Sequence, residues 1–331
     1  MNVLEVADLG VTFATEDGPV VAVDRLDYEV REGEILAIVG ESGCGKSVGV
    51  LSLLGLQPGN STVSGRVSYR GEDLLTVSES RLRGLRGRDI AYIFQDPMTA
   101  LNPLMTVGTQ VAETLRKHLG MSKAAARERV VELLELVGIP AARERLGVYP
   151  HQLSGGMRQR VMIAMAIACD PKLLIADEPT TALDVTVQAG IIETLKELRD
   201  RLGMAIVIIT HDMGVVADIA DRVVVMYAGK AIESAPVVEL FAHPTHPYTR
   251  GLLQAVPQRG QHATAHRLKG ISGNVPVLRS TAVACSFADR CAFASDACRA
   301  VRPEPAPIAG AGHTVACLHP QTEPLLLQKG A

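Results

Sequence analysis

The sequence predicts an α/β fold: a mostly parallel sheet covered by helices, joined by an antiparallel β part, an inserted helical part and a small Cys-rich C-terminal extension. Three observations lead to this prediction. Short continuous apolar runs recur along the chain, and helix-length segments lie between several of them. The pattern of apolar residues also changes near residues 96 and 235. Continuous apolar runs are typical of strands buried on both faces. Their alternation with helices favours parallel pairing.

The expected strands follow in chain order. Residues 2–30 alternate short β-branched runs with a turn signal at 16–19, which indicates antiparallel strands. Helix-length segments, notably 185–202, separate several of the later runs. The continuous apolar runs that we interpret as buried strands are 35–39, 90–94, 173–176, 205–210 and 223–227.

Two further regions depart from this alternation. Residues 96–160 show helical periodicity without a strong strand signal, which predicts a helical subdomain inserted into the core. After about residue 235, His-Pro and Arg-Pro pairs interrupt short apolar pieces. We therefore expect a core domain over residues 1–235 and a separate C-terminal extension over 236–331.

Composition narrows the class of protein. The 331 residues suffice for about two domains. With 33 Lys plus Arg against 36 Asp plus Glu, and no Trp, neither a polybasic nor a stacked-aromatic nucleic-acid surface is expected. The longest uncharged apolar run, 161–169, is far shorter than the roughly 20 residues of a membrane-spanning helix. The start lacks the pattern of a secretory signal, so we expect a cytoplasmic chain that other chains hold at any membrane it serves.

A phosphate-binding loop follows the run at 35–39. It fits G-x-x-x-x-G-K-[ST] and lies between a predicted strand and a predicted helix, as that motif requires. Its backbone N–H groups would surround phosphate oxygens, Lys46 would bridge the β- and γ-phosphates, and Ser47 would ligate Mg²⁺. Cys44 is interpreted as a small filler. A chance glycine-rich turn would lack these flanks. The predicted nucleotide-binding residues of the loop are Gly40, Glu41, Ser42, Gly43, Cys44, Gly45, Lys46 and Ser47.

Two acids end the apolar run at 173–176. A carboxylate at a strand end suits Mg²⁺, which predicts a metal-binding role for Asp177. Glu178, pointing elsewhere, would polarise an attacking water as general base. A solvated acidic turn is the alternative, and the preceding phosphate loop weighs against it.

The segment Leu153-Ser154-Gly155-Gly156-Met157 opens a predicted helix with Ser154 at its cap. Here the sequence resembles the ATP-binding-cassette (ABC) ATPases, whose signature is LSGGQ, over about residues 1–235. The resemblance implies a RecA-like P-loop core, and places Gln95 in the Q-loop as a catalytic residue and as a further Mg²⁺ and nucleotide ligand. It also places Asp184 in the D-loop and His211 in the H-loop, at the γ-phosphate.

Two positions depart from the family pattern. Met157 replaces the signature Gln and removes a polar contact, although Ser154 and the two glycines remain. The adenine-stacking aromatic of the family should fall near Thr15, and Phe13 lies two residues earlier, either as the base contact or as part of the core. His211 also has a second interpretation, as a strand-end histidine with satisfied hydrogen bonds.

Four segments, 40–43, 94–103, 149–154 and 246–253, resemble the peptide/nickel import group, and this likeness covers the whole chain. It implies a bacterial importer at the cytoplasmic face of the plasma membrane. Two ATPase subunits, paralogues or copies, would drive two permeases fed by an extracytoplasmic binding protein. ATP would lie between the P-loop of one subunit and Ser154, Gly155, Gly156 and Met157 of the other. Hydrolysis would power uptake of di- or oligopeptides, with nickel or glutathione as alternative cargo.

Three other kinds of ABC protein would show different sequence features. A non-transport ABC ATPase would usually show a second cassette, a coiled coil or a basic face. An exporter would usually carry its own membrane segment or a different permease partner. A cassette without catalysis would lack Lys46, Glu178 or His211, and all three are present.

Four of the six cysteines stand in the extension, at Cys285, Cys291, Cys298 and Cys317. Four thiolates are the number that ligates a [4Fe–4S] cluster, and relatives of the peptide-import group carry one in this region. Zinc is the rival, although zinc hairpins favour shorter spacers than those found here. The third interpretation keeps the cysteines as small buried apolar residues.

Overall fold

The computed structural model describes residues 1–181, 183–255, 270–308 and 312–323. The chain forms two compact units, and each draws on segments that are far apart in the sequence. The first comprises residues 1–3, 30–35 and 76–209, and the second comprises 4–29, 36–75 and 210–331. The division into domains at residue 235 stays a prediction.

The first unit contains three parallel strands. Their order is β6 (Ile90–Ile93), β7 (Leu173–Asp177) and β8 (Ala205–Thr210), with Ala91 opposite Leu174 and Leu174 opposite Ile206. Every residue of β7 and β8 is buried, which explains why their sequences are apolar without alternation. The apolar runs at 90–94, 173–176 and 205–210 therefore mark real strands.

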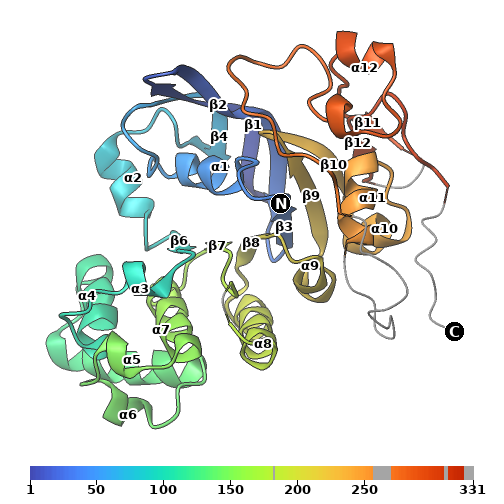
Figure 1. Ribbon diagram of the computed structural model, residues 1–331. Coiled ribbons are helices and arrows are strands. Elements are labelled where there is room, and N and C mark those ends of the chain that lie inside the picture. Colours follow the sequence, from blue (N-terminus) through green and yellow to red (C-terminus); the bar gives the residue numbers. More distant parts are fainter. Residues whose placement is uncertain (182, 256–269, 309–311, 324–331) are drawn as a thin grey trace, which may run out of the picture. The chain divides into compact units, whose positions relative to one another are not determined.

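Between β6 and β7 the chain is helical, as the periodicity of residues 96–160 predicts. Figure 1 shows α3 to α7 gathered together, and buried Val111, Val130 and Ile163 belong to their apolar faces. Side-chain oxygens cap the helices that begin after Thr106, Ser122 and Ser154. The helices of this unit are α2 (Glu79–Leu85), α3 (Pro97–Ala100), α4 (Val107–Leu119), α5 (Lys123–Leu136), α6 (Ala142–Arg145), η1 (Pro150–Gln152), α7 (Gly155–Ile167) and α8 (Val185–Leu202).

The second unit holds the antiparallel strands expected in residues 2–30. The strand order is β2-β1-β4-β5, and β1 pairs with β4 with Val6 opposite Val67 and Val11 opposite Val63. Leu9, Val11, Val23 and Val67 are buried on these strands. The strands are β1 (Asn2–Thr15), β2 (Gly18–Arg31), β4 (Ser61–Tyr69) and β5 (Glu72–Asp73).

A second group of strands in this unit has mixed directions. β3 (Ile35–Val39) pairs in parallel with β9 (Arg222–Tyr227), and β10 (Lys230–Pro236) runs antiparallel to β9. The C-terminal part adds β12 (Thr314–Val315) to β10 and β11 (Ala306–Pro307) to β12. The helices are α1 (Lys46–Leu53), α9 (Met213–Ile219), α10 (Val237–Ala242), α11 (Pro247–Gln254), η2 (Ala288–Arg290) and α12 (Asp296–Ala300).

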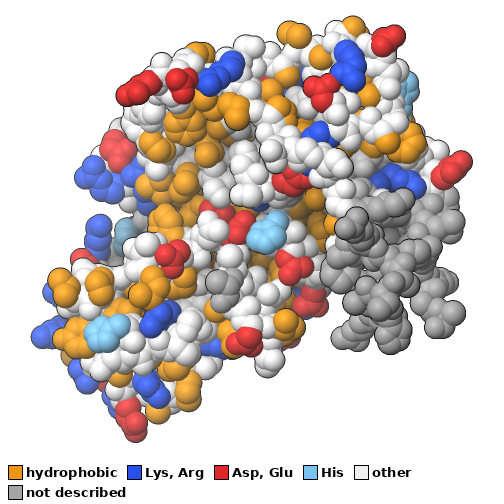
Figure 2. Space-filling model, in the orientation of Figure 1, with side chains coloured by type: hydrophobic (Ala, Val, Ile, Leu, Met, Phe, Trp, Pro, Cys, Tyr) orange, Lys and Arg blue, Asp and Glu red, His pale blue; other side chains and the backbone are white. Residues whose placement is uncertain are grey.

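The surface carries charges of both signs. On the face shown in Figure 2, Lys and Arg side chains are interspersed with Asp and Glu on each unit. Within the residues that the structure describes, no helix combines the length and apolar character needed to cross a membrane.

An aromatic cluster joins the C-terminal part to β9. Tyr227, Tyr248 and Phe287 meet edge to face, with ring centroids 4.8 Å, 5.1 Å and 5.4 Å apart. Such pairs each contribute about 0.5–1.5 kcal/mol beyond the apolar area they bury. Residues 227, 248 and 287, distant in sequence, thus share one core.

Buried polar groups lie beside this cluster. The Glu233 carboxylate accepts hydrogen bonds from the backbone N–H groups of Thr245 and His246, at 2.7 Å and 2.9 Å, and it lies 2.8 Å from His313 Nε2. Burial alone raises the pKa of Glu233, but these hydrogen bonds together hold it below its usual value. His246 Nδ1 accepts the Tyr248 N–H at 3.0 Å. Burial disfavours its charged form and lowers the pKa of His246 to about 4.

Acid should therefore destabilise the protein through His246. Its pKa is lower in the folded than in the unfolded chain, so the unfolded chain binds the extra proton, and stability falls as the pH drops from about 6.5 towards 4. His246→Asn keeps an oxygen acceptor at the helix cap but does not titrate. Between pH 7.5 and 5.5 we expect the wild type to lose about 1.5 kcal/mol more of its unfolding free energy than the variant. Urea unfolding at both pH values measures this, and equal losses would contradict it.

Candidate functional site

The loop predicted to bind phosphate lies between β3 and α1. Lys46 is buried, and its Nζ donates hydrogen bonds to the carbonyl oxygens of Gly40 and Glu41, at 2.7 Å and 3.0 Å. Cys44 is 1% exposed, and burial raises the pKa of its thiol. The thiol is therefore held neutral, in keeping with its interpretation as a filler.

Two glycines of the loop are required by close backbone packing. A Cβ at Gly40 would lie 2.3 Å from the carbonyl oxygen of Met226 in β9, and one at Gly45 would lie 2.2 Å from that of Ala22 in β2. Both also have φ angles in the positive range, +158° and +98°. The loop thus packs against the backbone of β9 at Gly40 and of β2 at Gly45, and no side chain fits at either position.

The C-terminal part holds the same loop. Arg290, at the end of η2, donates from both terminal nitrogens to the Glu41 carboxylate at 2.8 Å and 3.0 Å. The Arg290 side chain is only 8% exposed, and this hydrogen bonding raises its pKa further. Tyr248 Oη accepts the backbone N–H of Glu41 at 2.8 Å. Both sides of residue 41, backbone and carboxylate, are bound by residues that come more than 200 positions later.

The two predicted carboxylates occupy the end of β7 in the first unit. Asp177 is buried and accepts a hydrogen bond from Tyr92 Oη at 2.8 Å, and burial and this carboxylate raise the pKa of the tyrosine. Glu178 Oε2 accepts hydrogen bonds from Gln95 Nε2 at 3.0 Å and from Thr181 Oγ1 at 2.8 Å. The structure thus brings together two predicted residues, Gln95 and Glu178.

The signature segment and Asp184 are also neighbours in the first unit. Ser154 caps α7, its Oγ accepting the Met157 N–H at 3.4 Å. Asp184 caps α8, its Oδ1 accepting the Val187 N–H at 3.0 Å. A Cβ at Gly156 would lie 2.5 Å from Val187 Cγ1. The first turns of α7 and α8 therefore contact each other at Gly156, which follows Gly155 in α7.

The remaining predicted residues lie in the second unit. His211 is exposed after β8, next to Asp212, which caps α9. Phe13 is half-buried on β1, opposite Ser61, and Thr15 Oγ1 donates to the Gly18 carbonyl within the β1–β2 turn. Neither Phe13 nor Thr15 lines the pocket that adjoins the P-loop.

The four C-terminal cysteines lie near one another. Cys285 N–H donates to the Cys298 carbonyl at 2.9 Å, and burial raises the pKa of the Cys285, Cys291 and Cys317 thiols, that of Cys317 to about 11. Neighbouring cysteines add to each shift. Nevertheless, among the described residues no group of three or more His, Cys, Asp or Glu side chains could hold a metal ion. The four cysteine side chains therefore do not form a preassembled metal site in the part of the chain that the structure describes.

Several residues of these sites escape sequence reasoning. Tyr92 and Thr181 bind the two carboxylates, and Arg290 and Tyr248 bind residue 41. Tyr92 lies within a predicted strand and Tyr248 within a segment noted only for its resemblance. No local pattern marks any of the four as a partner of these sites.

The packing of Gly45 yields a stability prediction. Gly45→Ala places a methyl group against the Ala22 carbonyl, whereas Gly43→Ala shares a positive φ, +81°, but meets no atom within 4 Å. We expect Gly43→Ala to lower the unfolding free energy by about 1 kcal/mol. Gly45→Ala should lower it by about 2 kcal/mol more, through the clash. Urea unfolding of both variants measures the difference, and equal losses would show that the backbone carbonyl gives way without cost.

Comparison with known proteins finds a family match for each of two parts of the chain. The model of the family described as "ABC transporter" matches residues 23–181, and that described as "Oligopeptide/dipeptide transporter, C-terminal region" matches residues 232–298. A probable peptide ABC transporter ATP-binding protein of Sinorhizobium fredii is 52% identical over 316 residues, which cover 95% of this chain and 94% of that protein. The dipeptide transport ATP-binding protein DppD of Escherichia coli is 50% identical over 305 residues, 92% of each chain.

Solved structures of ATP-binding cassettes also match this chain. The dimeric ATP-binding cassette MJ0796, described as a post-hydrolysis state bound to ADP and Pi, matches with a TM-score of 0.64 and 28% identity over 71% of this chain and 98% of that one. The protein cbiO1 of Clostridium perfringens matches with a TM-score of 0.60 and 29% identity over 72% of this chain and 90% of that one. The fold is thus the α/β cassette of the ABC ATPases, with mixed sheets. The chain belongs to the ABC transporter family, among the ATP-binding proteins that carry an oligopeptide/dipeptide transporter C-terminal region.

Proposed function

We propose that this chain is the ATP-hydrolysing subunit of an importer for di- or oligopeptides. The observation that carries the hydrolytic part is the Glu178 carboxylate, which is oriented by hydrogen bonds from Gln95 and Thr181 at the end of a buried strand. The cargo is supported by relatives at 50–52% identity that are named for peptide or dipeptide transport. Nickel or glutathione would be a different outcome of a transport assay.

The proposed roles follow the chemistry of each group. Lys46 and the backbone N–H groups of residues 40–47 bind the phosphates of ATP, and His211 contacts the γ-phosphate. The Ser47 hydroxyl, the Gln95 amide and the Asp177 carboxylate offer the hard oxygen donors that suit Mg²⁺. When bound, Mg²⁺ neutralises phosphate charge. The chain's own contribution is to hold these oxygens in place, as Tyr92 does for Asp177 at 2.8 Å.

Glu178 acts as the general base. Its carboxylate accepts a proton from the water that attacks the γ-phosphate. Gln95 and Thr181 both donate to Oε2, so they fix the plane of the carboxylate. A base that is oriented before the reaction loses no free energy to reorientation during it.

A second subunit completes each site in this proposal. The starts of α7 and α8, with Ser154, Gly155, Gly156, Met157 and Asp184, would face the γ-phosphate bound to the partner's P-loop. The MJ0796 cassette, described as dimeric and bound to ADP and Pi, supports this arrangement. The partner is a paralogue or a second copy. ATP-driven closure of the pair would be transmitted through the helices α3–α7 to two permeases, which an extracytoplasmic binding protein supplies, at the cytoplasmic face of the bacterial plasma membrane.

Two substitutions separate binding from turnover. Glu178→Gln removes the base but keeps the phosphate ligands, so we expect ATP affinity to be retained and turnover to fall at least about 100-fold. Lys46→Ala removes a phosphate ligand, so affinity itself should fall. Nucleotide affinity and steady-state hydrolysis of the assembled transporter measure both effects.

Glu197→Gln is the matched control, because Glu197 is exposed on α8 and is none of the groups assigned a role above. It should leave both quantities unchanged. Normal turnover in the Glu178 variant would remove Glu178 from the role of base, and unaltered affinity in the Lys46 variant would remove the P-loop from the role of phosphate site.

We also infer that the cysteines at 285, 291, 298 and 317 bind a [4Fe–4S] cluster, with Zn²⁺ as the rival. Two observations support this: the Cys285 N–H donates to the Cys298 carbonyl at 2.9 Å, and backbone N–H groups of Phe293 and His319 donate to the sulfurs of Cys291 and Cys317 at 3.3 Å. Hydrogen bonds to sulfur are common around iron–sulfur ligands. The cluster would brace a part of the chain that has little core of its own.

Metal analysis tests this inference. Anaerobically purified protein should contain about four irons per chain and show visible absorbance that a reductant bleaches. Cys291→Ser should lose the iron, and Cys169→Ser, which changes a cysteine outside the four, should keep it. Stoichiometric zinc without iron would establish the rival, and the absence of both metals would leave the cysteines as buried apolar residues.

A further inference from the structure

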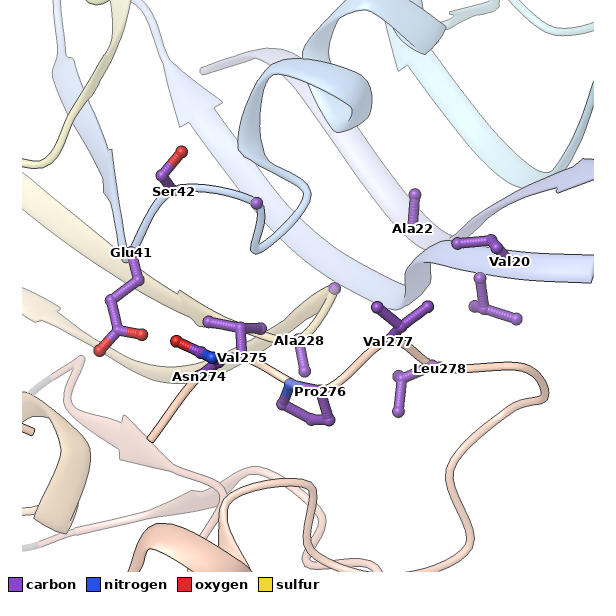
Figure 3. A pocket seen from close by; sticks show the side chains of 13 residues that line it. Val20, Ala22, Glu41, Ser42, Ala228, Asn274, Val275, Pro276, Val277 and Leu278 are labelled. Atoms are coloured by element: carbon purple, nitrogen blue, oxygen red, sulfur yellow. The ribbon is translucent and has the colours of Figure 1, made fainter. Parts of the chain in front are cut away.

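Glu41 is an acidic residue inside the loop that is proposed to bind phosphate. Residues 40–47 contain two charged side chains, Glu41 and Lys46. Lys46 would attract a triphosphate, whereas a carboxylate in the same loop would repel it. In Figure 3 the Glu41 side chain extends from the loop towards the chain at Asn274, whereas Ser42 points to the opposite side. The Glu41 carboxylate is thus directed at the C-terminal part of the chain.

Arg290 of the C-terminal part pairs with this carboxylate. Its two terminal nitrogens donate to the two Glu41 oxygens at 2.8 Å and 3.0 Å, and the Arg290 and Glu41 side chains are 8% and 28% exposed. A pair with two parallel hydrogen bonds fixes the direction of both groups. It also cancels the negative charge of Glu41, which leaves the positive charge of Lys46 in the loop.

The backbone of residue 41 links Arg290 to the lysine. The Glu41 N–H donates to Tyr248 Oη at 2.8 Å, and the Glu41 carbonyl accepts a hydrogen bond from Lys46 Nζ at 3.0 Å. Residue 41 is therefore bound by the C-terminal part through its N–H and its carboxylate, and by Lys46 through its carbonyl. A displacement of residue 41 would also displace the ammonium group that is proposed to bind the phosphates.

The Arg290 side chain is itself held in one position. Its Nε donates to the Ser272 carbonyl at 2.8 Å, and a terminal nitrogen donates to the Ile271 carbonyl at 3.2 Å. Its guanidinium carbon lies 5.6 Å from the ring centroid of Tyr227 and 5.9 Å from that of Phe287, within the range of cation–π contacts. A group locked by its neighbours in this way can position another group accurately.

We propose that Arg290 is a positioning residue for phosphate binding. It neutralises the Glu41 carboxylate and holds residue 41 where its carbonyl accepts the Lys46 ammonium. The inference rests on the proposed binding of ATP phosphates by the P-loop. It adds that the C-terminal part sets the affinity of this loop for phosphate, through one guanidinium group.

The substitution Arg290→Gln tests this in the full chain. The unpaired Glu41 carboxylate would repel phosphate, so we expect MgATP and inorganic tripolyphosphate each to bind about tenfold more weakly. In the assembled transporter, KM for ATP should rise by a similar factor while kcat stays unchanged. Arg302→Gln is the matched control, because Arg302 is a C-terminal arginine that is 12% exposed and pairs with Asp24 at 3.5 Å. It should leave both affinities unchanged.

A double-mutant cycle separates positioning from a general loosening of the C-terminal part. In a Glu41→Gln background there is no carboxylate to neutralise, so adding Arg290→Gln should change either affinity by less than about twofold. Arg290→Lys keeps the charge but not the two parallel hydrogen bonds. It replaces Arg290→Gln in the cycle if that variant does not fold, with an expected loss of about threefold in the wild-type background only.

Each outcome decides the matter. A loss of affinity in the wild-type background alone supports the positioning role. Equal losses in both backgrounds, or a comparable loss in the Arg302 variant, would show that loosening the C-terminal part is responsible, which overturns the proposal. Unchanged affinity in the Arg290 variants also overturns it, while leaving the proposed ATP binding intact. A wild-type chain that binds neither probe overturns the proposed function itself, and this inference with it.

Discussion

Backbone packing against the phosphate loop is the constraint on which the functional part of the second unit depends. Carbonyl oxygens of β9 and β2 approach positions 40 and 45 so closely that neither tolerates a Cβ. The loop is fixed between two strands, and Lys46 is held beneath it by two loop carbonyls. Its N–H groups can then meet phosphate oxygens without reorganisation, which is the condition for strong electrostatic binding.

The same packing explains how the C-terminal extension becomes part of the cassette. Arg290 binds Glu41 and the carbonyls of Ile271 and Ser272 at once, and Tyr248 accepts the N–H of residue 41 from within an aromatic cluster. Removing one partner of this partly buried ion pair would leave the other charge without compensation. The extension and the P-loop are therefore energetically coupled, even though about 250 residues separate Glu41 from Arg290.

The first unit shows how the carboxylate of Glu178, the proposed general base, is positioned. Glu178 has a φ of +47°, in the left-handed region that non-glycine residues rarely adopt. Its N–H donates to the Ile209 carbonyl, and its carboxylate accepts from Gln95 and Thr181. Strained backbone of this kind persists only where surrounding contacts hold it, and it is concentrated at functional sites. The turn at residue 178 thus aims the carboxylate away from Asp177, which the preceding strand keeps buried.

Local patterns determined much of this protein. Runs buried on both faces gave correct strands at 35–39, 173–176 and 205–210, because burial leaves a continuous apolar signal, and the helix at 185–202 was predicted to the residue. The P-loop, the signature at Ser154 and the two acids at the end of β7 could be recognised because their chemistry requires fixed residues at short spacing. Partners without such spacing could not be found in this way. Arg290, Tyr248 and Tyr92 act through contacts with residues 85 to 249 positions away, and Val277 lines a pocket beside the P-loop only because the neighbouring Leu278 bonds to β2. A sequence pattern encodes what neighbours along the chain must share, whereas long-range contacts are decided when the chain packs.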